Sequence, residues 1–121
     1  MKEPTLGNPQ NTIAVLQKYN FVFQKKFGQN FLIDTHVLDK IIGSAEITKD
    51  DFVLEIGPGI GTMTQYLACA AGKVAAVEID KALIPILEDT LDGYDNVQVI
   101  NEDVLKAVSY THLRAHETRE D

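Results

Sequence analysis

Apolar and polar positions along the chain follow two patterns. Short apolar runs bounded by turn-forming residues predict strands buried inside a sheet, and the first of them is expected to be buried on both faces. These runs are residues 52–56, 73–80 and 96–103. Apolar residues at helical spacing predict helices between the runs and before them. These helices are residues 35–44, 62–71 and 80–91, with a shorter one near residue 13. Strands and helices that alternate over short connections are typical of parallel βαβ units, so the sequence predicts an α/β fold.

Residues with defined roles at helix ends set the expected boundaries. Asn11 or Thr12 is expected to cap the first helix, and Asp34 or Thr35 the second, because their side chains accept bonds from free main-chain N–H groups. Gly72 is expected to form the C-terminal cap of the third helix. Pro85 lacks a backbone donor, so it should shift or bend the start of the fourth helix.

A glycine-rich loop follows the first predicted strand, in "VLEIGPGIGTMT". Gly57, Gly59 and Gly61 permit positive φ and leave no Cβ in the way of a ligand, and ligands of such sheets bind beyond the carboxyl ends of the strands. A dinucleotide site favours G-x-G-x-x-G, but Thr62 stands where that pattern has its third glycine. The spacing therefore favours an adenosine ligand without a pyrophosphate, such as S-adenosylmethionine, over a nicotinamide cofactor.

Acidic residues lie at the ends of successive predicted strands. Glu78 comes 21 positions after Gly57 and is placed to accept hydrogen bonds from ribose hydroxyls, or to be a solvated acid at a strand end. Asp103 is placed to accept from the adenine amino group, or to cap the following turn. We expect Glu55 to brace the loop rather than to take part in chemistry.

Charge divides the chain unevenly. Residues 1–33 hold four of the 11 Lys and Arg but one of the 18 Asp and Glu, so they carry +3 and the remainder −10. A basic arm before an acidic body is compatible with a polyanionic partner, although four lysines can also be ordinary solvated surface. The length of 121 residues and the 45% hydrophobic content predict a single domain.

The remaining chemistry-bearing residues predict no further site. Cys69 is the single cysteine and is expected to be a small buried hydrophobe. His112 and His116 are four residues apart, but no third ligand accompanies them, so no metal is expected. No apolar stretch approaches the roughly 20 residues that span a bilayer, and no secretory signal is recognisable. The default expectation is a cytoplasmic protein.

Four stretches together resemble one protein family. "KKFGQNFLID", "VLEIGPGIGTMT", "VAAVEIDKALIPIL" and "NVQVINEDVLK" are similar to the N-terminal part of the bacterial small-subunit (16S) rRNA adenine N6,N6-dimethyltransferases. The resemblance implies the N-terminal half of a class I, Rossmann-like S-adenosylmethionine-dependent methyltransferase fold, truncated after about three parallel strands. Transferred position by position, it implies that Asn30 and Leu32 line the methionine end of S-adenosylmethionine, Gly57 contacts it from the loop, Glu78 holds the ribose and Asp103 the adenine.

The resemblance also implies partners. Small-subunit rRNA, within a pre-30S ribosomal subunit, would be the substrate of a monomeric enzyme, and Lys25 and Lys26 are candidates for phosphate contacts. Two alternatives stay open. Large-subunit (23S) rRNA methyltransferases that confer macrolide resistance share the "FGQNFL" motif, and a non-catalytic module would bind an adenosine ligand or RNA without turnover.

The sequence departs from the family after about Lys106. The family's Asn-Leu-Pro-Tyr motif, which holds the target adenine once it leaves the RNA stack, does not occur as Asn-x-Pro-Tyr anywhere in this chain. The expected organisation is a basic arm with a short helix (1–23), a partial S-adenosylmethionine-binding domain (24–106) and a non-native or disordered tail (107–121). We expect a truncated gene product that is inactive alone and prone to aggregate.

Overall fold

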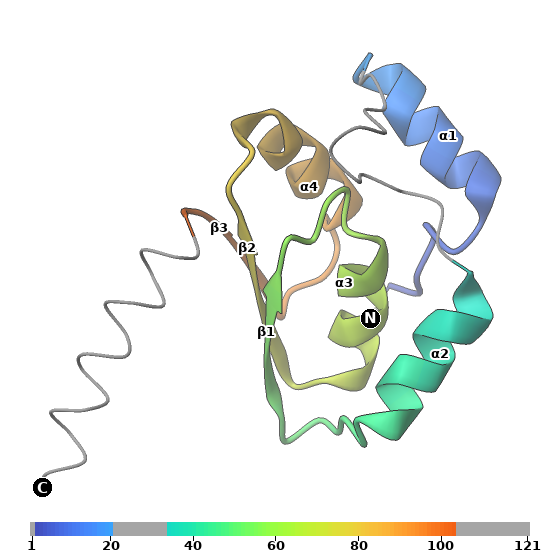
Figure 1. Cartoon of the computed structure of the whole chain (residues 1–121), viewed down its shortest axis with the longest axis vertical. Helices are drawn as coiled ribbons and strands as arrows, with labels where there is room; N and C mark the ends of the chain where they lie inside the picture. The colour runs from blue at the N-terminus through green and yellow to red at the C-terminus, as the bar shows by residue number, and fades with distance from the viewer. Residues whose placement is uncertain (1, 21–33, 104–121) are drawn as a thin grey trace, which may run out of the picture.

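The computed structural model describes residues 2–20 and 34–103, which form a three-stranded parallel sheet beside a layer of helices (Figure 1). The sheet order is β1-β2-β3, with Val53 opposite Val74 and Val74 opposite Val97. The strands are β1 (Phe52–Ile56), β2 (Lys73–Glu78) and β3 (Val97–Asn101). The predicted parallel α/β arrangement is confirmed.

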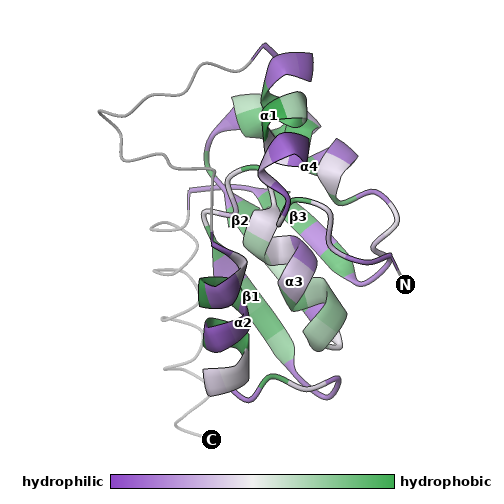
Figure 2. Ribbon diagram, turned by 90° about the vertical axis from the view of Figure 1, so that its right-hand side faces the viewer, coloured by the Kyte–Doolittle hydropathy of each residue, from purple (hydrophilic) through white to green (hydrophobic). Residues whose placement is uncertain are grey.

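The helices of the described residues all lie on one side of the sheet (Figures 1 and 2). They are α1 (Pro9–Lys18), α2 (Thr35–Ser44), α3 (Thr62–Ala70) and α4 (Ile84–Thr90), with the short 3₁₀ turn η2 (Lys81–Leu83) before α4. Leu67, Ala68 and Val74 form part of a core between α3 and the sheet. None of the helices in the described ranges is long and apolar enough to cross a membrane.

The first helix begins earlier than the sequence predicts. Its cap is Asn8, whose side chain accepts from the N–H of Gln10 at 2.9 Å, and Pro9 occupies the first helical position, where no N–H is needed. The expected caps at Asn11 and Thr12 are therefore wrong. Thr12 is 1% exposed, and its hydroxyl donates to the Leu6 carbonyl instead.

The predicted ends of the other helices are close to those observed. Asp34 caps α2 as expected, through the N–H of His36. Pro85 is the second residue of α4, and the turn η2 precedes it, which is the shifted start that proline predicts. Gly72 is not the cap of α3, because that position is Ala71. Gly72 is small for another reason, since a Cβ there would lie 2.1 Å from the Lys49 carbonyl oxygen.

The first strand is not buried on both faces. Phe52, Leu54 and Ile56 are 64%, 55% and 57% exposed, whereas Val53 and Glu55 on the other face are half-buried. The helices of the described residues cover only that second face. The prediction of two-sided burial is wrong for this part of the chain, although the predicted strand bounds are confirmed.

The N-terminal segment packs onto the helices. Leu6 is 3% exposed and lies in a core cluster with Ile60, Leu83 and Ile86. The Tyr19 hydroxyl and the Lys18 ammonium both bond to Asp89 of α4, at 2.5 and 2.7 Å. The predicted domain boundary at residue 23 and the predicted tail lie outside the described residues.

Candidate ligand-binding site

The glycine loop begins where β1 ends and closes back onto β2. Gly57, Gly59 and Gly61 have φ values of +71°, +62° and +97°, a region that residues with a Cβ rarely adopt. The N–H of Gly57 donates to the Val77 carbonyl at 2.9 Å, which continues the ladder between β1 and β2 by one bond. A Cβ built on Gly57 would meet no atom within 4 Å. The main chain at Gly57 is therefore open to an approaching group.

Gly61 is required for a different reason. It is the N-cap of α3 and supplies no side-chain cap, while its own N–H donates to the Pro58 carbonyl at 2.9 Å. A Cβ on Gly61 would lie 2.9 Å from the Thr90 hydroxyl oxygen and 3.3 Å from a Leu87 methyl group. The missing side chain thus leaves open space beside the main chain at Gly57, and it leaves space for α4 at Gly61.

Glu78 links the end of β2 to the glycine loop. Its Oε1 accepts from the N–H of Gly59 at 3.2 Å, and its Oε2 accepts from the N–H of Asp80 at 3.0 Å. The side chain is 6% exposed. Each oxygen of a carboxylate can accept a second hydrogen bond, so Glu78 keeps acceptor capacity for hydroxyl groups. The prediction that this acid ends the second strand, beside the loop, is confirmed.

Asn101 at the end of β3 was not identified from the sequence. Its register partner is Glu78, and its amide donates to the carbonyls of Glu78 at 2.7 Å and Ile79 at 3.3 Å. A polar residue that ends an apolar run, as in "VINED", was the available signal. Asp103 follows two residues later and is half-buried, so one predicted acid ends β2 and the other lies just beyond the end of the neighbouring parallel strand β3.

Glu55 was expected to brace the glycine loop, but its hydrogen bond is to the first turn of α3, directly after that loop. Its Oε1 accepts a hydrogen bond from the Thr64 hydroxyl in the first turn of that helix. Burial raises the pKa of the Glu55 carboxyl, and the nearby Glu78 carboxylate raises it further, while the bond from Thr64 opposes the shift. Glu78 of β2 thus holds the loop itself, and Glu55 of β1 holds the helix that follows it.

Several predicted residues lie outside the described ranges. Asn30 and Leu32, expected at the methionine end of the ligand, fall within 21–33, as do Lys25 and Lys26. His112 and His116 fall within 104–121. Their roles stay predictions. In residues 2–20 and 34–103, no group of three His, Cys, Asp or Glu side chains is arranged to hold a metal ion.

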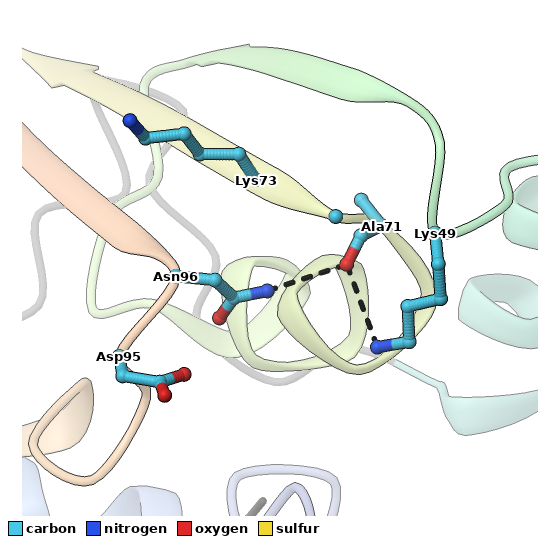
Figure 3. A pocket seen from close by; sticks show the side chains of 6 residues that line it. Lys49, Ala71, Lys73, Asp95 and Asn96 are labelled. Atoms are coloured by element: carbon cyan, nitrogen blue, oxygen red, sulfur yellow. Dashed lines mark hydrogen bonds between the residues drawn. The ribbon is translucent and has the colours of Figure 1, made fainter.

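A surface hollow of about 420 Å³ lies at the amino ends of the strands, opposite the glycine loop (Figure 3). It is lined by the first residue of β2 and by the residues just before β3. Lys49 and Asn96 point from two sides at the Ala71 carbonyl, and they also bond the carbonyls of Cys69 and Ala68. These contacts satisfy the carbonyls that the C-terminus of α3 leaves free. The Lys49 ammonium and the Asn96 amide nitrogen thus serve the end of this helix, whereas the buried Oδ1 of Asn96 accepts no hydrogen bond within the described residues. The glycine loop remains the candidate site because an open main chain and the Glu78 carboxylate lie there together.

Known proteins resemble this chain in sequence and in fold. A curated relative from Lachnoclostridium phytofermentans, the ribosomal RNA small subunit methyltransferase A, is 76% identical over 102 residues, which are 84% of this chain and 35% of the relative. The crystal structure of the 23S rRNA methyltransferase ErmE matches with a TM-score of 0.59 and 42% identity, over 63% of this chain and 31% of that one. Coclaurine N-methyltransferase, crystallised with N-methylheliamine and SAH, matches with a TM-score of 0.53 and 25% identity, over 58% of this chain and 22% of that one.

The fold is that of the Rossmann-like methyltransferases that use S-adenosylmethionine. Within that class, the family model described as ribosomal RNA adenine dimethylase matches residues 20–120. The chain belongs to this family. It spans about a third of the length of the curated relative that it matches.

Proposed function

We propose that the carboxyl ends of β1, β2 and β3 bind S-adenosylmethionine, as the donor half of an enzyme that dimethylates N6 of adenines in small-subunit (16S) rRNA. The observation that carries this proposal is the closure of the glycine loop by Glu78, with an unobstructed main chain at Gly57. The 76% identity with a small-subunit methyltransferase supports the rRNA target.

Each residue has a distinct part in this proposal. The open main chain at Gly57 would let the ligand lie against the loop, and the spare acceptor capacity of Glu78 suits two ribose hydroxyls. Asp103, two residues after the end of β3, would accept from the adenine amino group. Asn30 and Leu32 would complete the methionine end. S-adenosylmethionine supplies a methyl group on a sulfonium, and the amine that receives it loses a proton. Because this amine is a poor nucleophile, its alignment with the methyl group matters most.

The proposed substrate is the rRNA of a pre-30S subunit, held partly by phosphate contacts from Lys25 and Lys26. A cytoplasmic, monomeric enzyme is part of the same proposal. The target adenine requires an Asn-x-Pro-Tyr segment that this sequence does not contain, so the 121 residues alone should bind the donor without methylating RNA.

A second candidate is methylation of large-subunit (23S) rRNA. It is favoured by the 42% identity with ErmE, which is named as a 23S rRNA methyltransferase. Both candidates use the same donor site, so they differ only in the subunit that carries the product.

A chimera tests whether this chain supplies the donor half required by the first candidate. The 102 aligned residues of the Lachnoclostridium relative are replaced by those of this chain, and the chimera is incubated with unmethylated small or large subunits. Mass spectrometry then measures N6,N6-dimethyladenosine in each rRNA. We expect product on the small subunit, and none from a chimera with Glu78→Ala. Product on the large subunit alone would favour the second candidate. An inactive chimera beside an active parent would contradict the proposed function.

A further inference from the structure

We propose that Thr90, at the end of α4, is a positioning residue that fixes the glycine loop 57–61 from the side opposite Glu78. This inference rests on the proposed function for the identity of the ligand, but its structural part concerns the loop alone. Thr90 is 30 residues away from the loop in sequence, and no motif marks it.

The Thr90 hydroxyl holds the main chain of the loop directly. It donates to the carbonyl of Ile60 at 2.7 Å, and both residues are buried, at 6% and 1% exposed. A carbonyl in such surroundings loses a hydrogen bond at a substantial cost, because water does not replace the donor. Gly59, the residue before Ile60, is held by Glu78. The loop is thus attached at two successive residues, to β2 and to α4.

The glycine at position 61 supports the same role. Its φ of +97° turns the chain into α3, and a Cβ there would lie 2.9 Å from the Thr90 hydroxyl oxygen. The close approach of α4 therefore requires a glycine at this position. One hydroxyl accounts both for the bond to Ile60 and for the small residue at position 61.

Gln65 holds Thr90 itself in place. Its Nε2 donates to the Thr90 carbonyl at 2.8 Å, and its main-chain N–H donates to the Gly61 carbonyl at 3.0 Å. Its Oε1 accepts from the N–H groups of Thr5 and Leu6, both at 2.9 Å, and the side chain is 0% exposed. Every polar atom of this buried amide has a partner. Gln65 of α3 therefore holds the main chain at Thr90.

Thr90→Val tests the inference, because valine keeps the shape of threonine and removes only the hydroxyl. Thr12→Val is the matched control: Thr12 is also buried, and its hydroxyl donates to the carbonyl of Leu6, which is outside the loop. Amide hydrogen exchange at Gly59 and Gly61 is measured by NMR in the 121-residue chain. Loss of one buried bond should accelerate this exchange about tenfold in Thr90→Val. We expect Thr12→Val to leave the exchange at Gly59 and Gly61 unchanged in comparison with the exchange of the amides of α3.

Thr90→Ser provides the second variant, since it keeps the hydroxyl and loses the methyl group. Loop exchange at the rate of the unsubstituted chain is expected for Thr90→Ser. Exchange that is unchanged in Thr90→Val, equally accelerated in Thr12→Val, or accelerated in Thr90→Ser would overturn the inference.

Titration with S-adenosylhomocysteine separates this inference from the proposed function. We expect the dissociation constant to rise about tenfold in Thr90→Val and to stay unchanged in Thr12→Val. Faster amide hydrogen exchange of the loop in Thr90→Val, together with no binding of S-adenosylhomocysteine to any variant, would contradict the proposed donor site. The positioning role of Thr90 would still be supported. Binding that is equally tight in Thr90→Val and the unsubstituted chain would overturn the positioning role.

Discussion

The N–H of Gly59 donates to Oε1 of Glu78 at 3.2 Å, across 19 positions of sequence. This bond joins the loop after β1 to the end of β2, and the second oxygen of the same carboxylate holds the N–H of Asp80. A buried acid that holds the main chain at both of its oxygens fixes the shape of the loop before any ligand arrives. The donor site proposed here is therefore largely preformed.

Removal of the Glu78 carboxylate should weaken donor binding strongly. Glu78→Ala loses the bond to Gly59 and the proposed bonds to ribose, and hydrogen bonds to a charged group suggest a roughly 10- to 100-fold higher dissociation constant for S-adenosylhomocysteine. Isothermal titration calorimetry provides the measurement. Glu88→Ala on the exposed surface of α4 is the control and should bind normally. Equal affinities in the two variants would remove Glu78 from the site.

Substitution of Gly57 should act through both strain and blocked space. Gly57→Ala places a Cβ at a φ of +71°, which costs roughly 1–2 kcal/mol of folding free energy. The new methyl group also occupies the space where the ligand would approach. Gly43→Ala is the control, because Gly43 lies in α2, has no positive φ and has nothing within 4 Å of its Cβ position. It should stabilise the chain by roughly 0.5–1 kcal/mol. Thermal unfolding and titration with S-adenosylhomocysteine measure the two effects, and normal binding by Gly57→Ala would argue against the proposed ligand position.

The raised pKa of Glu55 predicts a pH-dependent stability. Because the folded chain holds this proton more tightly than the unfolded chain, the contribution of Glu55 to stability is largest below the ordinary pKa of 4.5 and falls as the pH rises through the raised folded value. Glu55→Gln keeps an acceptor for the Thr64 hydroxyl and removes the charge. Urea unfolding should show Glu55→Gln to be more stable than the unsubstituted chain at pH 7.5, with an advantage that shrinks toward pH 4. An advantage that grows on acidification would reverse the assigned sign.

The exposed face of β1 predicts self-association of the 121-residue chain. Phe52, Leu54 and Ile56 are each more than half exposed, and β1 is an edge strand within the described residues. Leu54→Lys should therefore shift the chain toward monomer in size-exclusion chromatography with light scattering. Gln98→Lys changes an exposed polar residue of the other edge strand and should have no such effect. A chain that is already monomeric at high concentration would contradict the prediction.

The elements of the fold were largely predictable because they depend on local patterns. Apolar runs placed all three strands, and Asp34 marked the start of α2. The one-sided burial of Phe52–Ile56 was not predictable, since burial depends on which face of the strand the described helices cover. The cap at Asn8 was missed because proline at the first helical position moves the helix start upstream of the apolar pattern.

The candidate site was predictable only in part. Gly57 and Glu78 stand out because a run of spaced glycines directly after one strand, followed by an acid at the end of the next, is rare in purely structural loops. Thr90 and Asn101 do not, because their contacts to Ile60 and Glu78 exist only once α4 and β3 are packed. A threonine at the end of a helix or an asparagine at the end of a strand is common, so a signal such as the polar end of "VINED" is too weak to select either residue.

The proposed donor site lies at the carboxyl ends of the strands and not at the hollow beside their amino ends. Amide chemical shifts of the 121-residue chain, recorded by NMR during titration with S-adenosylhomocysteine, distinguish these two places. We expect shifts at Gly57, Gly59 and Glu78, with Lys73 and Asn96 beside the hollow unchanged. Shifts confined to Lys73 and Asn96, or no shifts at saturating ligand, would contradict the proposed site.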